Sequence, residues 1–90
     1  MTKEKTKFES EISETEVKSN QLILFNDEVN SFDFVIDSLV EVCNHNPMQA
    51  ENCAMIAHYK GKCSVMKGSF KHLETYFIEL SNRQLTVEIQ

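Results

Sequence analysis

The sequence predicts a small α+β domain, in which a three-stranded antiparallel sheet packs against three helices in the order β-α-α-β-α-β. Three observations predict this class. Short apolar runs at 21–25, 62–66 and 84–89 are typical of strands, and the stretches between them repeat apolar residues at helical spacing. Asn, Pro, Gly and Ser residues mark the junctions. Ninety residues hold at most one domain, close to the size at which a single core becomes marginal.

The first strand and helix are predicted on either side of a short connection. The strand is QLILF, residues 21–25, whose nearly continuous apolar content favours a central or doubly covered position in the sheet. The helix is expected to begin after Asn30 as its N-cap, with Asp33 completing a capping-box-like pair. One apolar face of this helix is formed by Phe32, Val35, Ile36, Leu39 and Val42 or Cys43.

The second helix has clear start and stop signals. Asn46 is its expected N-cap, Pro47 occupies the first helical position, and Gly61 ends it. Small residues form one stripe along it, so the helix can approach its neighbours closely: Ala50, Cys53, Ala54 and Ala57.

The remaining elements follow after Gly61. KCSVM, residues 62–66, is the second strand, and Ser69 is the expected cap of the third helix. The core stripe of that helix is Phe70, Leu73, Phe77 and Leu80. In QLTVEI, residues 84–89, apolar and polar residues alternate, which predicts an edge or one-sided strand.

Residues 1–20 differ in character from the rest. MTKEKTKFESEISETEVKSN is polar, so it buries too little surface to offset chain entropy, and we expect a disordered extension before a domain at 21–90. The segment has no apolar h-region and is rich in Glu, which argues against a secretory signal or a transit peptide.

Composition excludes several classes of function. A net charge of −5 with scattered basic residues argues against a nucleic-acid partner. No apolar run approaches the ~18 residues of a membrane span. Three cysteines without a Cys-x-x-Cys pair predict reduced, buried thiols, a cytoplasmic location and no metal site. Without a Gly-rich phosphate loop, no cofactor is expected.

The connection after the first strand carries the chemistry of interest. Asp27 could accept hydrogen bonds from an ammonium group, with Asn26 beside it as a neutral donor and acceptor. His58 shares a helix face with Ala54, which leaves room for a side chain next to the amine. The alternative is that Asn26 and Asp27 are ordinary turn residues and His58 a structural hydrogen bonder.

Catalysis is a weaker alternative. It would use Asp27 or Glu28 with His58 as an acid/base pair, or Cys43 or Cys53 with a histidine as a thiol pair. We therefore do not expect an enzyme.

FNDEVNSFDFVID followed by AHYKGK resembles the ClpS family, adaptors of the ATP-dependent Clp protease. The family signature reads Asn-Asp-Asp, Thr-Pro-Met and Glu-Phe-Val, and then a histidine with an aromatic residue and a glycine. This chain matches it with residues 26–28, 33–35 and 58–61, whereas residues 30–32 replace Thr-Pro-Met and Ala54 replaces a usual Met.

The resemblance implies an adaptor that binds proteins through a hydrophobic or aromatic first residue and delivers them to the N-terminal domain of a Clp AAA+ unfoldase. It implies that Asn26, Asp27 and His58 hold the α-amino group. The pocket for the first side chain would be lined by Asn30, Phe32, Val35, Ala54, Ala57 and Leu85. A second interpretation is a regulatory module that docks on the unfoldase without using this pocket.

Overall fold

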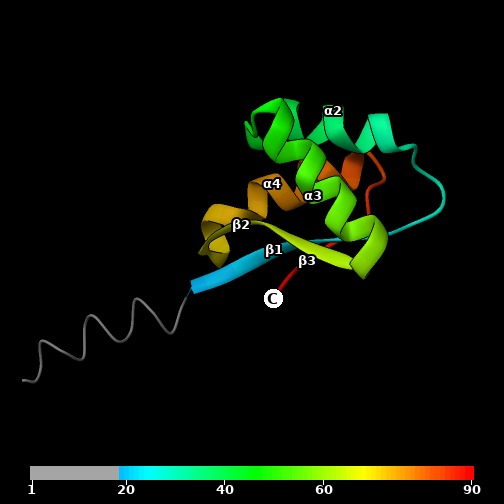
Figure 1. Cartoon of the computed structure of the whole chain (residues 1–90). Coiled ribbons are helices and arrows are strands. Elements are labelled where there is room, and N and C mark those ends of the chain that lie inside the picture. The colour runs from blue at the N-terminus through cyan, green and yellow to red at the C-terminus, as the bar shows by residue number, and fades with distance from the viewer. Residues whose placement is uncertain (1–18) are drawn as a thin grey trace, which may run out of the picture.

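The computed structural model describes residues 19–90 of the chain. Its elements are β1 (Ser19–Phe25), α2 (Phe32–Cys43), α3 (Pro47–Lys60), β2 (Lys62–Ser69), α4 (Phe70–Asn82) and β3 (Val87–Ile89) (Figure 1). The predicted order β-α-α-β-α-β is confirmed. The first strand begins at Ser19, two residues before its predicted start. The expected disorder of residues 1–18 falls outside the described residues.

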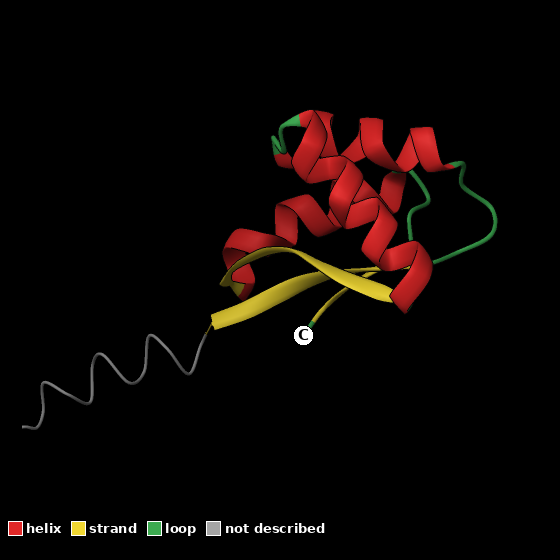
Figure 2. Cartoon of the chain, viewed as in Figure 1, coloured by secondary structure: helices red, strands yellow, loops and turns green. Residues whose placement is uncertain are grey.

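The sheet is antiparallel, as predicted, with the strand order β2-β1-β3. The strand rich in apolar residues, β1, is therefore central, and the three-residue β3 lies at an edge. The ladder between β1 and β2 shifts register between Leu22 and Ile23, because Leu22 faces Met66 and Ile23 faces Ser64, which leaves Val65 as an extra residue. All three helices lie on one side of the sheet (Figure 2).

The core lies between this sheet face and the helices. Leu22, Leu39, Leu73 and Leu80 are fully buried in it. The small residues of α3 are buried as expected, which lets this helix sit close to α2 and β2: Ala50, Cys53, Ala54 and Ala57. The prediction that Phe70 belongs to the core is wrong. It is the first residue of α4, and its side chain is 54% exposed.

Three of the four helix boundary signals are confirmed by the hydrogen bonds they make. The Asn46 side chain accepts from the backbone of Gln49 (2.8 Å), with Pro47 at the start of α3. Ser69 accepts from the backbone of His72 (3.1 Å) at the start of α4. Gly61 ends α3 with φ +99°, a left-handed conformation that favours glycine.

The predicted cap of the first helix is wrong by one residue. Ser31 is the N-cap of α2, and its hydroxyl accepts from the backbone N–H of Phe34 at 3.1 Å. The Asn30 side chain is instead held at the connection, because its amide nitrogen donates to Asp27 (3.0 Å) and to the backbone carbonyl of Gln84 (2.9 Å), and its oxygen makes no cap bond. Asp33 consequently lies in the first turn without a capping-box partner, where its charge still favours the helix N-terminus.

The connection between α2 and α3 is fixed by a buried histidine. The imidazole of His45 is 7% exposed, and its Nε2 lies 2.9 Å from the carbonyl oxygen of Val65, the extra residue of β2. Since Nδ1 has no hydrogen-bond partner and the carbonyl can only accept, Nε2 carries the proton. His45 therefore ties the helical layer to the irregular point of the strand.

No helix within residues 19–90 is both long and apolar enough to cross a lipid bilayer.

Candidate functional site

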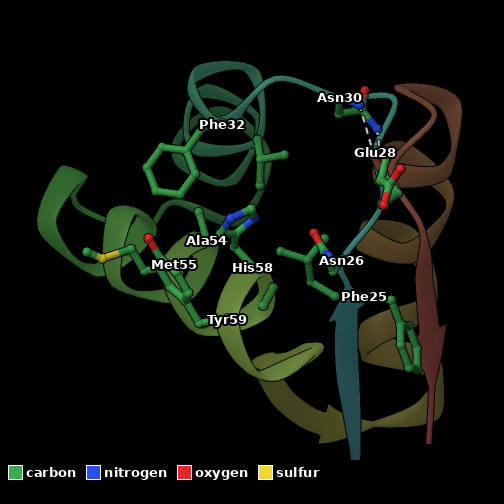
Figure 3. A pocket seen from close by; sticks show the side chains of 13 residues that line it. Phe25, Asn26, Glu28, Asn30, Phe32, Ala54, Met55, His58 and Tyr59 are labelled. Carbon is green, nitrogen blue, oxygen red and sulfur yellow. Dashed lines mark hydrogen bonds between the residues drawn. The ribbon is translucent and has the colours of Figure 1, made fainter.

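A pocket of about 680 Å³ opens where the β1–α2 connection meets the first turn of α2 and the last turns of α3 (Figure 3). Its lining comes from two stretches of the chain, 24–35 and 54–59: Leu24, Phe25, Asn26, Asp27, Glu28, Asn30, Phe32, Val35, Ala54, Met55, Ala57, His58 and Tyr59.

This pocket brings together eight of the nine predicted site residues. They are Asn26, Asp27, Asn30, Phe32, Val35, Ala54, Ala57 and His58. The ninth, Leu85, is not among the lining residues. It lies between α4 and β3, is 4% exposed, and packs in the hydrophobic core.

Asp27 organises the connection that follows β1. One carboxylate oxygen, Oδ1, accepts from the backbone N–H groups of Val29 (3.0 Å) and Asn30 (2.9 Å), which makes an Asx turn. The other, Oδ2, accepts from the side chains of Asn30 (3.0 Å) and Thr86 (3.3 Å). All four lone-pair directions of the carboxylate thus have a donor from the chain itself, of which Thr86 is the most distant.

These bonds determine the charge state of Asp27. Partial burial opposes ionisation, but the hydrogen bonds from Asn30, Val29 and Thr86 favour the carboxylate more strongly, so the pKa of Asp27 lies below its ordinary value. Asp27 is therefore a fixed negative charge at neutral pH. Glu28, next in sequence, is exposed and adds a second carboxylate to the same end of the pocket.

The connection is fastened to the domain on two sides. The backbone N–H of Asn26 donates to the carbonyl of Gly61 at 3.0 Å, which joins the start of the connection to the turn between α3 and β2. The Asn30 side chain donates to the carbonyl of Gln84, in the turn between α4 and β3, where Gln84 has a positive φ of 69°. The acidic end of the pocket is thus held in place by two turns, each with one residue in a left-handed conformation.

His58 comes to the pocket from the last turn of α3. Its side chain is exposed, and within residues 19–90 neither ring nitrogen makes a hydrogen bond. Its ring meets that of Tyr59 edge-on, with the centroids 4.7 Å apart. In contrast to the engaged carboxylate of Asp27, this imidazole has both nitrogens available for a ligand.

The pocket has one polar end and one apolar end. In Figure 3 Asn26, Glu28 and Asn30 stand on one side, Phe32, Ala54 and Met55 on the other, and His58 between them. Two carboxylates and no Lys or Arg line the pocket, so its polar end attracts cations. An ammonium group attached to an apolar side chain matches this division.

Several lining residues are not among those predicted from the sequence. Met55 and Tyr59 are 42% and 78% exposed and lie four residues apart on α3, and Glu28 is predicted only as a possible acid/base partner of His58. Exposed apolar residues one helical turn apart are the signal that identifies Met55 and Tyr59, because a soluble helix face without a partner is usually polar.

The buried thiols Cys43 and Cys53 are poorly suited to act as catalytic thiolates at neutral pH. Burial, with a contribution from the charge of Glu79, raises the pKa of Cys43 to about 11. Burial also raises the pKa of Cys53, above the range in which a thiolate forms at neutral pH. Among residues 19–90, no group of three His, Cys, Asp or Glu side chains is arranged to hold a metal ion.

The fold and the pocket define a small binding domain with an acidic, histidine-containing end beside an apolar chamber. The family model of the ATP-dependent Clp protease adaptor protein ClpS matches residues 15–88, most of the chain. The chain therefore belongs to the ClpS family, whose members are adaptors of the Clp protease and not catalysts.

Solved structures agree with this assignment at the level of the fold. The chain is similar to the structure of Agrobacterium tumefaciens ClpS2 bound to L-phenylalaninamide, with a TM-score of 0.75 and 23% sequence identity. The similarity covers 81% of this chain and 95% of the Agrobacterium chain. Among curated proteins, none matches this chain.

Proposed function

We propose that this adaptor recognises proteins by a hydrophobic or aromatic N-terminal residue and delivers them to the N-terminal domain of a Clp AAA+ unfoldase. The observation that carries the proposal is the division of the pocket into an acidic end and an apolar end. A chain N-terminus is the one place in a protein where an ammonium group and a hydrophobic side chain are attached to the same carbon atom.

In this proposal the α-amino group lies at the polar end, between Asn26 and His58. The side-chain oxygen of Asn26 and a neutral ring nitrogen of His58 accept hydrogen bonds from the ammonium. Asp27 supplies negative charge. Because its carboxylate is already engaged, it receives a direct bond from the ligand only if the ammonium displaces Thr86, the most distant of its four donors.

The first side chain lies at the apolar end, among Phe32, Val35, Ala54 and Ala57. The alanines keep this part of α3 open, and burying a Leu or Phe side chain here contributes about 1.5–3 kcal/mol. The ligand of the Agrobacterium protein, L-phenylalaninamide, has a free α-amino group next to an aromatic side chain and supports this assignment.

The test is a titration with fluorescent peptides that begin with Leu or Phe, each prepared with a free and with an acetylated N-terminus. Acetylation removes the charge and donors of the amine. Hydrogen bonds to charged groups contribute about 1.5–3 kcal/mol each, so affinity should fall at least about tenfold. His58→Ala should weaken binding of the free peptide in the same way, whereas His72→Ala, which changes an exposed histidine of α4 outside the pocket, should not.

Equal affinity for free and acetylated peptides would show that the pocket does not recognise the α-amino group. If neither peptide binds while the chain still docks on a Clp unfoldase, the chain acts as a regulatory module that does not use the pocket. Docking can be followed independently, by gel filtration with the isolated N-terminal domain of the unfoldase.

A further inference from the structure

Two of the three cysteines meet on the side of α3 away from the candidate site. Cys53, on α3, and Cys63, the second residue of β2, lie with their sulfur atoms 2.7 Å apart. The only other hydrogen-bond partner of either sulfur within residues 19–90 is the carbonyl of Ser64, at 3.9 Å from Cys53 and 3.6 Å from Cys63. Both thiols are free. A disulfide has a sulfur–sulfur distance of about 2.05 Å, so the two sulfur atoms need to approach only slightly further for the bond to form.

The two thiols differ in their access to solvent. Cys53 is 5% exposed and belongs to the core, whereas Cys63 is only partly buried. Both line a second, shallow pocket of about 490 Å³ that is separate from the candidate site. A small oxidant entering this pocket therefore reaches Cys63 first and finds Cys53 directly behind it.

We propose that Cys53 and Cys63 are a redox pair that forms a reversible disulfide between α3 and β2 when the protein meets a hydroperoxide. Hydrogen peroxide transfers one oxygen atom to the Cys63 thiolate, which becomes a sulfenic acid, and hydroxide leaves and takes up a proton to become water. The Cys53 thiol then attacks the Cys63 sulfur while its proton passes to the departing sulfenic oxygen, which leaves as a second water. In total, two thiols and one hydrogen peroxide give one disulfide and two waters.

The alternative is that both side chains are small core hydrophobes, which is the common role of buried cysteines. If both side chains were only packing residues, nothing would require the two sulfur atoms to lie in contact. Nothing would require one of them to face a pocket open to solvent either. In a reducing compartment the pair would be a transient crosslink, since cytosolic disulfides that do form usually serve redox sensing.

The crosslink would close the chain from residue 53 to residue 63, across the turn at Gly61. Closing a loop of this length restricts the unfolded chain, so oxidation should raise the Tm by about 10 °C. The disulfide also holds the C-terminal half of α3 on β2, and backbone amides in that half should exchange more slowly with solvent.

In the test, the full chain is oxidised with stoichiometric hydrogen peroxide. The intact mass is measured, the crosslinked peptides are mapped, and the Tm is recorded before and after addition of dithiothreitol. We expect a loss of two hydrogen atoms, a crosslinked peptide containing Cys53 and Cys63, and a higher Tm that dithiothreitol reverses. Cys63→Ser should abolish the crosslink. Cys43→Ala, which removes the third thiol, should leave it intact. Because the peptide map uses the wild-type chain, it remains decisive if a variant folds poorly.

Three results would overturn the proposal. One is conversion of Cys63 to sulfinic acid without a crosslink, and another is a crosslink that contains Cys43 or joins two chains. The third is no loss of free thiol with either hydrogen peroxide or diamide, which would leave the pair as packing residues only.

Discussion

Replacing Asp27 by alanine should destabilise the domain even in the absence of any ligand. The carboxylate accepts four hydrogen bonds, from two backbone N–H groups and the side chains of Asn30 and Thr86. Hydrogen bonds to a charged group contribute about 1.5–3 kcal/mol when buried, but Asp27 is only partly buried and water can reach the released donors, so each bond here is assigned only about 0.5 kcal/mol. The sum is a loss of about 2 kcal/mol in the free energy of unfolding, or about 10 °C in Tm.

The dependence of this loss on pH follows from the pKa of Asp27. Because that pKa is lowered in the folded state, the stabilisation is fully present above the unfolded-state value of about 3.9. It disappears as the pH falls through the folded-state pKa. The difference between wild type and Asp27→Ala should therefore be constant near neutral pH and shrink below about pH 4.

The assay is urea denaturation followed by circular dichroism at about pH 7 and about pH 3, with two comparison variants. Asp27→Asn keeps an oxygen for the Asx turn but loses the charge, so it should cost less than Asp27→Ala. Asp37→Ala removes an exposed aspartate of α2 and should stay within about 0.5 kcal/mol of wild type. If Asp27→Ala behaves like Asp37→Ala, or if its deficit is the same at both pH values, the carboxylate does not hold the connection in place.

Three further substitutions test the scaffold by thermal or chemical denaturation. Gly61→Ala should cost about 1–2 kcal/mol through backbone strain alone, because an added Cβ meets no atom within 4 Å, and unchanged stability would contradict the left-handed conformation. His45→Phe leaves the buried carbonyl of Val65 without a donor and should cost about 1–3 kcal/mol, so a loss below about 0.5 kcal/mol would show that this bond is replaced by water. Ser31→Ala should cost about 1 kcal/mol and Ser31→Thr much less, whereas equal losses would place the N-cap of α2 elsewhere.

Most of the fold could be predicted because local signals and the apolar pattern agree. The caps at Asn46 and Ser69 and the stop at Gly61 depend on short-range geometry, which a sequence displays directly. The continuous apolar content of β1 predicted a central or doubly covered strand, and β1 is central, between β2 and β3, with three consecutive buried residues.

The errors concern residues whose partners are distant in sequence. Asn30 has a good N-cap side chain, but the carbonyl of Gln84, 54 residues away, binds its side-chain N–H and competes with the helix start for the orientation of the side chain, so Ser31 is the N-cap. Likewise, periodicity placed Phe70 in the core although it precedes the part of α4 that faces the sheet. No local pattern reports such competition, and it becomes visible only when the turn between α4 and β3 is brought beside the connection after β1.

In the candidate site, too, some residues could be predicted from the sequence and others could not. Asp27 proved to be both a turn former and a pocket residue, so the two interpretations of the Asn26–Asp27 pair were not exclusive. Leu85 could not be placed from the sequence, because its side chain turns into the core at the end of α4. Met55 was missed because it belongs to no motif, and Tyr59, although it is the aromatic residue of the motif at 58–61, was not assigned to the pocket.

The two ends of the pocket are built by separate parts of the chain, and this has a consequence for protein engineering. The acidic end belongs to a connection fastened through backbone carbonyls at Gly61 and Gln84, which side-chain substitutions elsewhere leave unchanged. The apolar end includes exposed positions of α2 and α3, namely Phe32 and Met55, whose side chains contribute little to the core. A library randomised at these two positions could therefore produce variants that accept different first residues while the part that holds the amine stays intact.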